Sequence, residues 1–551
     1  MSTSASATAD SDSEVQSRTQ QSPMASQRAN AENPRRSRLE GLFPLSYKQG
    51  FSQWWTALPA AQAEHRVLSF VPHLQQPPTH TKTGSAPPSQ TNSTITIDKT
   101  ASPDAVTSTN SITDPYGPRT WHSRLVPLSG KNRALNEFSV VRNVPEEGDP
   151  EHNLVILHGY GAGLGFFYKN FEPLSRAPGW QLYALDMLGM GRSSRPPFRL
   201  KSKTREAQIT EAEDWFIDSL EEWRVKKKID KMTLMGHSMG GYMAVCYALK
   251  YPGRLNKLIL ASPVGIPEDP YATHAAMPPP PDSTAQNEVT TPDQAQLKQK
   301  PNPNRLPVKD ISSADTSSSE ETPTPPPRRP LPKWLTYLWD ANISPFSFVR
   351  WSGPLGPRLV SGWTSRRFSH LPSEEALALH DYSYSLFRLR GSGEYALAYI
   401  LAPGAFARSP LIRRIGSVGR QPLTASTHEV NEQGQLKQFP GSSSTAPNNT
   451  SSPDVERERG IPVVLMYGEN DWMDVSGGYA AKKKIDAETA RALATASPEE
   501  RARDHGSAKV VIISNAGHHL YLDNADEFNE VILAEMEDVR RRTLKEKERM
   551  R

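Results

Sequence analysis

The sequence holds one cysteine, Cys246, among its 551 residues, which excludes a disulfide within the chain. It also lacks any apolar run close to the ~18 to 20 residues that cross a membrane as a helix. The 64 basic residues are nearly balanced by 60 acidic ones, which argues against a dedicated nucleic-acid-binding protein. No group of His, Cys, Asp or Glu has the spacing of metal ligands, so we expect no metal. Residues 1–30 have no apolar signal-peptide core, so simple secretory targeting is not expected.

Apolar residues are also scarce: they make up only 36% of the chain, while prolines number 49. A large part of the chain therefore cannot belong to a packed core. Polar tracts rich in Ser, Pro, Thr or Gln predict disordered or linking segments at 1–40, 76–118, 268–330 and 416–458. Between them lie an N-terminal segment at 41–75, a first folded part at 119–267, an apolar, helix-rich part at 331–415 and a second folded part at 459–545.

The N-terminal segment 41–75 is crowded with aromatic residues. Phe51, Trp54, Trp55 and Leu58 fall at helical spacing on one side. A stripe of this kind is typical of a packing face within a fold. It is equally typical of shallow insertion at a membrane surface, because paired tryptophans favour the interface. Both interpretations remain open.

The two folded parts alternate short apolar runs with helical patterns. The runs that predict strands are 138–141, 153–157, 181–185, 233–235, 258–260, 461–467 and 509–513. Helices are expected over 205–227, after residue 238, and over 526–545. Alternation of strands with helices predicts an α/β fold with a mostly parallel sheet flanked by helices. Such a sheet keeps its functional site at the carboxyl ends of its strands.

The residues Gly236 to Gly240 fit the pattern G-x-S-x-G, with Ser238 at its centre. They stand between a predicted strand and a predicted helix, which is the context of a nucleophile elbow. The glycines are needed because a side chain at Gly236 or Gly240 would meet the neighbouring strand or helix. The alternative is an ordinary helix start that is capped by Ser238. The flanking strand and helix favour a catalytic serine.

A serine hydroxyl is a weak nucleophile until a base removes its proton, and the base needs an orienting acid. In this kind of sheet the acid and then the histidine follow the serine, each after a later strand. His518 follows the run 509–513 and is preferred to its neighbour His519. Asp471 follows the run 461–467 and is the favoured acid, with Asp474 as the alternative.

An early strand ends in His158-Gly159-Tyr160-Gly161, which is typical of a turn that supplies oxyanion donors. We expect the backbone N–H groups of Tyr160 and Met239 to face the developing oxyanion. The pair Gly189 and Gly191 begins a dinucleotide-binding pattern whose third glycine is missing. No cofactor is therefore expected.

Taken together, these motifs resemble the α/β-hydrolases, and specifically the branch of lysophosphatidic acid acyltransferases, N-acylphospholipid lipases and mitochondrial cardiolipin deacylases. The long polar tracts resemble those of fungal members. The stretches that carry the resemblance are LVILHGYGAG, LDMLGMGRSSRP, GHSMGGY, SPFSFVRWSGPLGPRLV, PGAFARSPLIRRI, YGENDWMD and NAGHHLYLDNADEFN.

The resemblance implies an α/β-hydrolase core with a helical cap at 331–415, and a lipid-surface anchor at 41–75. It implies a serine hydrolase that deacylates phospholipids, with cardiolipin as one candidate. The first alternative is a coenzyme-A-dependent lysophosphatidic acid acyltransferase, for which acyl-CoA would be the co-substrate; the pattern from His518 to Asp523 matches an H-x-x-x-x-D motif linked to acyl transfer. The second is a non-catalytic scaffold that recruits a lipase at lipid droplets. A membrane-peripheral location is expected, with mitochondria favoured over lipid droplets and cytoplasm.

Overall fold

The computed structural model describes 44–74, 94–95, 105–108, 114–142, 151–268, 337–339, 341, 343–403, 405–423 and 456–550. The predicted segment 1–40 and most of the predicted segments 268–330 and 416–458 lie outside these residues.

One ten-stranded sheet, in the order β1-β2-β3-β4-β6-β5-β7-β8-β9-β10, forms the centre of the molecule. Its strands are β1 (Thr94–Ile95), β2 (Ala105–Ser108), β3 (Arg119–Pro127), β4 (Ala134–Arg142), β5 (His152–Leu157), β6 (Trp180–Leu185), β7 (Met232–His237), β8 (Leu255–Ala261), β9 (Pro462–Gly468) and β10 (Ser507–Ile513). The half from β6 to β10 is parallel, while β1 to β4 are antiparallel and β4 pairs with β6. The predicted mostly parallel sheet is thus confirmed for the half that carries the motifs.

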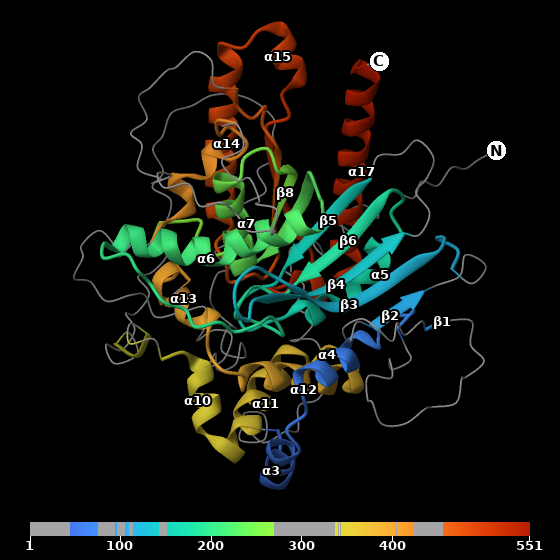
Figure 1. The fold of residues 1–551 in the computed structure, drawn as a ribbon, viewed down its shortest axis with the longest axis vertical. Helices are drawn as coiled ribbons and strands as arrows, with labels where there is room; N and C mark the ends of the chain where they lie inside the picture. The colour runs from blue at the N-terminus through green and yellow to red at the C-terminus, as the bar shows by residue number, and fades with distance from the viewer. Residues whose placement is uncertain are drawn as a thin grey trace, which may run out of the picture.

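Helices cover both faces of this sheet. Those of the core are α5 (Tyr168–Leu174), α6 (Arg205–Lys226), α7 (Met239–Lys250), α14 (Val475–Ala494), α15 (Pro498–Arg503), α16 (Leu520–Asp523) and α17 (Ala525–Met550), with the short 3-10 helix η1 (Leu164–Phe167). α6 packs beside α7 on one face, and α5 packs beside α17 on the other (Figure 1). The central strands β5, β7 and β9 are buried along their whole length, which explains their continuous apolar runs.

A second group of helices lies at one end of the molecule. The segment 331–415 contributes α10 (Pro345–Trp351), η3 (Gly353–Leu355), α11 (Gly356–Arg367), α12 (Ser373–Phe387), α13 (Gly393–Ile400) and η4 (Leu411–Arg413), and η5 (Ile415–Ser417) follows. The N-terminal segment adds α3 (Tyr47–Thr56) and α4 (Ala60–Leu68). α4 packs against α12, and α3 packs against η3 and α11, so the two segments form one layer below the sheet in Figure 1. We call 331–415 the cap and 44–74 the arm.

Two of the predicted boundaries need correction. The segment 76–118 was predicted to be a linker, yet it supplies β1 and β2, and β2 extends the sheet by pairing with β3. The predicted linker 416–458 is ordered at both ends. Pro422, in the segment that follows the cap, forms an antiparallel bridge with Arg457, in the segment that precedes β9.

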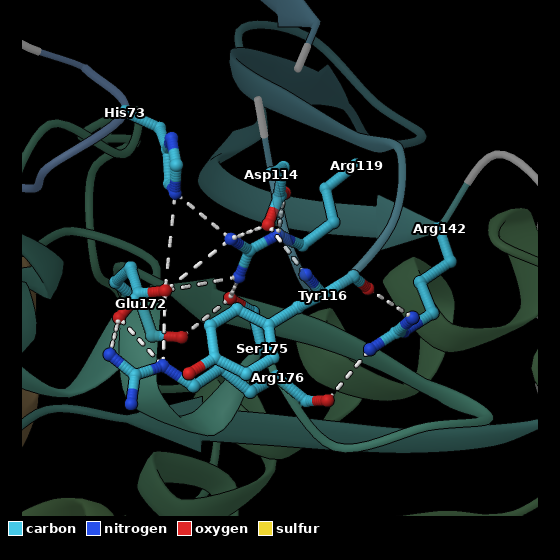
Figure 2. Close-up of polar contacts among 8 residues, drawn as sticks. All are labelled: His73, Asp114, Tyr116, Arg119, Arg142, Glu172, Ser175 and Arg176. Carbon is cyan, nitrogen blue, oxygen red and sulfur yellow. Dashed lines mark hydrogen bonds and ion pairs between the residues drawn. The ribbon is translucent and has the colours of Figure 1, made fainter. Parts of the chain in front are cut away.

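The C-terminal end of the arm contacts the sheet through Arg119, a buried arginine of β3 (Figure 2). Arg119 of β3 is fully buried, and its guanidinium donates to Asp114 at 2.7 and 2.9 Å. The same group reaches Glu172 at 3.3 Å, Ser175 at 2.7 Å and the ring nitrogen of His73 at 3.0 Å. A buried arginine needs this many partners because an unpaired charge is costly to desolvate. The arm is therefore part of the folded body at its C-terminal end.

Candidate active site

Ser238 stands in a sharp turn between the end of β7 and the start of α7. Its φ of 52° lies in the left-handed region, which is rare for a non-glycine residue. A Cβ at Gly236 would lie 2.2 Å from the carbonyl oxygen of Gly240, and one at Gly240 would lie 2.6 Å from that of Leu157. Only glycine fits at these two positions, as the motif predicts. The turn is therefore an elbow rather than a simple helix start.

The predicted base and acid are placed beside Ser238 by two neighbouring strands. His518 follows β10 and its Nε2 lies 3.0 Å from the Oγ of Ser238. Asp471 follows β9 and its Oδ1 lies 3.2 Å from the Nδ1 of His518. β9 pairs with β8 on one side and with β10 on the other. Asp471, at the end of β9, therefore lies between the end of β7, which leads to Ser238, and the end of β10, which leads to His518. The structure thus brings Ser238, His518 and Asp471 into one chain of polar contacts.

The alternative acid, Asp474, faces solvent. It is the N-cap of α14, and its carboxylate accepts from the backbone N–H of Ser476 at 2.8 Å. This is an ordinary role for aspartate at a helix N-terminus. Asp471, by contrast, is buried and also accepts from the backbone N–H of Met473 at 3.0 Å. The geometry favours Asp471 as the partner of the histidine.

A second serine, which was not among the residues predicted from the sequence, contacts both Asp471 and His518. Ser262 follows β8, is fully buried and has a φ of 47°. Its hydroxyl donates to Oδ2 of Asp471, and its Oγ lies 2.7 Å from Nδ1 of His518. With the proton of the imidazole on Nδ1, His518 can share it between Asp471 and Ser262. The available signal was the position of Ser262 directly after a predicted strand.

Two further histidines pack around the site. The Nε2 of His237 lies 2.8 Å from the carbonyl oxygen of His518, and the rings of the two residues are 4.8 Å apart. Burial holds the pKa of His237 well below its usual value, so the ring is neutral and can donate to that carbonyl. His519 is buried, and its ring packs against those of His237 and Tyr521, which also contact each other. These rings fix the backbone that carries His518.

The two expected oxyanion donors belong to residues next to groups that adjoin the serine: Met239 follows Ser238, and Tyr160 follows Gly159. Met239 is the first residue of α7, and a first-turn amide has no partner within its own helix. Tyr160 lies on the loop from His158 to Gly163 that joins β5 to η1; we call it the oxyanion loop. A Cβ at Gly159 would lie 3.1 Å from the Cβ of Ser238, so this loop passes directly over the nucleophile.

The second member of the proposed H-x-x-x-x-D motif supports the backbone next to His518. Asp523 accepts from the backbone N–H of Gly517 at 2.9 Å. Its other carboxylate oxygen lies 3.7 Å from Nε2 of His370 in the cap. Asp523 therefore joins the histidine loop to the cap, a structural task that does not require a part in acyl transfer.

The cap closes over the site. Ser238 is 0% exposed and His518 is 1% exposed. The ring of Tyr160 stacks on Phe346 of α10 at 4.9 Å, and Phe346 stacks on Phe387 of α12 at 4.3 Å. The cavity beside Tyr160 has a volume of about 30 Å³, room for roughly one water molecule. Aromatic side chains of the cap thus pack directly against the oxyanion loop.

Among the described residues, no group of three or more His, Cys, Asp or Glu side chains is arranged to hold a metal ion. None of the helices in this part of the chain has the length and apolarity needed to span a bilayer.

The chain is similar to several known proteins. A family model described as "alpha/beta hydrolase fold" matches residues 153–525. The chain is 30% identical over 394 residues to a 1-acylglycerol-3-phosphate O-acyltransferase of Arabidopsis thaliana; the match covers 70% of this chain and 66% of that relative, just under two thirds of its length. It is 28% identical to the human 1-acylglycerol-3-phosphate O-acyltransferase ABHD5, over 69% of this chain and 76% of the relative.

A human (lyso)-N-acylphosphatidylethanolamine lipase is also similar. It is 26% identical, over 72% of this chain and 82% of its own length. Among solved structures, a bromoperoxidase from Bacillus anthracis aligns with 75% of this chain and 99% of its own, at 16% identity and a TM-score of 0.38.

Proposed function

This chain belongs to the α/β-hydrolase family, and from that premise we propose that it is a serine-dependent enzyme that removes acyl chains from phospholipids. The observation that carries the proposal is the 3.0 Å contact between Oγ of Ser238 and Nε2 of His518 in a strained elbow. Asp471 and Ser262 lie on the far side of the imidazole. A nucleophile, a base and an orienting acid in this order form the standard arrangement for acyl transfer to serine.

The reaction follows from the positions of these groups. Ser238 attacks the ester carbonyl carbon while its proton passes to Nε2 of His518, and Asp471 stabilises the imidazolium. The N–H groups of Tyr160 and Met239 hold the negative charge that develops on the carbonyl oxygen. The intermediate collapses, the lysophospholipid oxygen takes the proton from His518, and an acyl-Ser238 ester remains. Water, deprotonated by His518, then releases the fatty acid and restores the serine.

The choice of substrate class rests on the relatives. The plant and human proteins are named as acyltransferases of an acylglycerol phosphate, and the third is named as a lipase of an N-acylated phospholipid. All three names describe acyl groups on glycerophospholipids. A phospholipid ester is therefore the best-supported substrate for this chain. Cardiolipin, and with it a mitochondrial location, are narrower proposals that rest on the motif resemblance alone.

Acyl transfer is the second candidate, and the acyltransferase names of the relatives favour it. The same acyl-Ser238 ester would form from acyl-CoA with release of the thiol. The hydroxyl of a lysophosphatidic acid, in place of water, would then attack the ester. The two candidates differ only in the donor and in the group that accepts the acyl chain. The third candidate, a scaffold without chemistry, leaves the intact Ser238–His518 pair without a purpose.

We also propose that the enzyme docks on a lipid surface through exposed aromatic side chains of the arm and cap. In α3, Phe51 and Trp55 are 51% and 72% exposed, and their rings stack 6.3 Å apart. Trp351 at the end of α10 is 67% exposed. Exposed tryptophans are suited to the membrane interface. Trp54 is only half-buried, and Leu58 packs on the core, so the inner side of the arm has a packing role beside the proposed surface role of Phe51 and Trp55.

Helix α10 contributes both to the proposed lipid-docking surface and to the cover of the active site. Phe346, on the inner side of α10, stacks over Tyr160, while Phe348 and Trp351 of the same helix are exposed. A lipid surface that binds the exposed side of α10 would therefore act on the same helix that packs against the oxyanion loop. This arrangement supports a docking step that opens the route from the bilayer to Ser238.

A lipid panel tests the proposed function. Purified protein and its Ser238→Ala variant are incubated with vesicles that contain phosphatidylethanolamine, N-acylphosphatidylethanolamine, phosphatidic acid or cardiolipin, and the products are quantified by mass spectrometry. We expect free fatty acid and lysophospholipid from at least one lipid, and none with the variant. A parallel reaction with acyl-CoA and lysophosphatidic acid separates hydrolysis from transfer. Equal product from both proteins in every arm would refute a serine-dependent reaction.

A further inference from the structure

A carboxylate of the arm is completely buried beside the active-site loops. Glu64 lies on α4, outside the residues 153–525 that the family model matches, and its side chain is fully inaccessible to solvent. Glutamate is almost never buried in this way unless its charge is paired. Nothing in the proposed reaction uses Glu64. Its burial therefore requires another explanation.

The partners of Glu64 come from three different parts of the fold. Arg192, on the loop between β6 and α6, donates from Nη1 at 2.5 Å. Asn136 of β4 donates from Nδ2 at 3.0 Å, and Tyr382 of the cap helix α12 donates its hydroxyl proton at 3.2 Å. One carboxylate thus joins the arm to the sheet and the cap.

Two of these partners connect Glu64 to a second buried carboxylate, that of Asp186 at the end of β6. The Nδ2 of Asn136 also lies 2.8 Å from Asp186, so its two amide protons can serve the two acids. The backbone N–H of Arg192 donates to Asp186 at 2.8 Å. Burial raises the pKa of both carboxyls, and the charge of Asp186 raises the pKa of Glu64 further. Arg192 and Asn136 make the close approach of the two acids tolerable.

Asp186 in turn holds the end of the oxyanion loop. Its Oδ1 accepts from the backbone N–H of Leu164 at 2.7 Å, where η1 begins. Its Oδ1 also lies 3.6 Å from Nε2 of His158, at the start of the loop. Burial lowers the pKa of His158 to about 4, so the neutral ring can accept from the backbone N–H of Met187, at 3.1 Å.

A second route from Glu64 to the same loop runs through Tyr382. The hydroxyl of Tyr382 accepts from the backbone N–H of Gly165 at 3.4 Å. A Cβ at Gly163 would lie 2.3 Å from this hydroxyl, so the loop is pressed directly against Tyr382. The loop that carries Tyr160 is therefore connected to Glu64 by two routes, one through Asn136 and Asp186 and the other through Tyr382.

From these contacts we infer that Glu64 is a positioning residue of the active site, which sets the oxyanion loop from a helix outside the hydrolase core. The inference rests on the proposed serine-dependent reaction, in which the amide of Tyr160 stabilises the transition state. The arm is then a working part of the enzyme as well as a surface anchor. A misplacement of about 1 Å in such a donor can cost about 100-fold in rate.

The test compares Glu64→Ala with Glu64→Gln and Val67→Ala. Val67 lies on the same helix and is fully buried, but it packs in the apolar core. With a short water-soluble ester, we expect Glu64→Ala to lower kcat at least about tenfold with KM unchanged within about twofold. Glu64→Gln, which keeps one acceptor oxygen, should recover most of kcat. Val67→Ala should lower the melting temperature and leave kcat near that of the parent.

Hydrogen exchange supplies a readout that does not depend on activity. Peptides that cover 158–166 should exchange faster in Glu64→Ala, while peptides from β9 should not change. Unchanged kcat and unchanged exchange in folded Glu64→Ala would overturn the inference, as would an equal loss of kcat in Val67→Ala. If the parent protein shows no Ser238-dependent hydrolysis, the proposed function fails instead, and the exchange experiment still decides whether Glu64 holds the loop.

Discussion

The two helices of the arm are neighbours in the chain, yet they differ in almost every physical respect. α4 buries Ala63, Glu64 and Val67 completely and places a charge at the junction of sheet and cap. α3 buries only Gly50 and turns Phe51 and Trp55 toward solvent. Removing a group from α4 should therefore disturb the fold or the reaction, while removing one from the outer side of α3 should disturb only what the protein binds.

The same contrast recurs at the candidate acid. Asp471 and Asp474 are three residues apart on one loop, but the first is buried against His518 and Ser262, and the second caps α14 in solvent. Proximity in sequence thus says little about function here. What distinguishes the two aspartates is whether the carboxylate is buried and which residue it contacts. The buried one contacts the catalytic histidine, and the exposed one only caps a helix.

The largest effect is expected at Asp471. Asp471→Asn keeps the size of the side chain but no longer stabilises the imidazolium of His518, so kcat should fall by roughly 10³- to 10⁴-fold. Asp474→Asn is the matched control and should remain within about threefold of the parent. Kinetics with a soluble ester measure both. A greater loss with Asp474→Asn would transfer the role of the acid and break the contrast between the two residues.

Ser262 should give the next largest effect. Ser262→Ala removes a hydroxyl that bonds to a charged carboxylate, an interaction worth about 1.5–3 kcal/mol. We therefore expect kcat to fall about 10- to 100-fold, with little change in KM. Ser476→Ala is the control, since Ser476 makes the corresponding contact to exposed Asp474 at 2.6 Å. Parent-like kcat in Ser262→Ala would show that Asp471 alone holds the histidine.

The outer side of the arm is tested by the double variant Phe51→Ala with Trp55→Ala. Partial burial of each ring in a lipid surface is worth about 1 kcal/mol or more, so the loss of both rings should weaken vesicle binding, measured by co-sedimentation, about 30-fold or more. Hydrolysis of a soluble ester and the melting temperature should stay near parent values, because both rings are exposed. The control is Val67→Ala, which should lower the melting temperature without weakening co-sedimentation. Parent-like co-sedimentation together with a lower melting temperature in the double variant would mean that α3 is a packing helix.

Buried histidines should also make the free energy of unfolding sensitive to acid. Burial lowers the pKa of His158 and of His380 to about 4, against an ordinary value of 6.5. The unfolded chain binds these protons below pH 6.5 and the folded chain does so only near pH 4, so the free energy of unfolding should fall as the pH decreases between these values. Each histidine contributes up to about 3 kcal/mol. Urea denaturation of His380→Gln should show a shallower pH dependence than that of the parent. An equal slope would exclude His380 as a source of the acid sensitivity.

The sequence allowed much of this account to be predicted because the site is built from strand ends. Ser238, Asp471 and His518 each follow a short apolar run, and these runs are recognisable one at a time. Ser262 also follows such a run, but its role depends on β8 lying next to β9, a pairing between strands about 200 residues apart. A local pattern does not contain that information.

Other features could not be found locally for similar reasons. β3 (Arg119–Pro127) was missed because its charged residues interrupt the alternation, and Arg119 is buried only through partners on other segments. Glu64 bonds to residues 72 and 128 positions away. In sequence it looks like one more polar residue of an amphipathic helix. Only the assembled arm, sheet and cap show that it is enclosed.

The most direct test of the central claim is detection of an acyl group on Ser238 during turnover. The protein is mixed with a short-chain ester, quenched in acid within milliseconds and digested, and the peptide that contains Ser238 is analysed by mass spectrometry. The account predicts that this peptide gains the mass of the acyl group before steady state. In His518→Ala supplied with an activated ester, the adduct should accumulate further, because no base then activates the water that releases the acyl group. Ser238→Ala should show neither the adduct nor hydrolysis. Steady hydrolysis by Ser238→Ala at the rate of the parent would contradict the account.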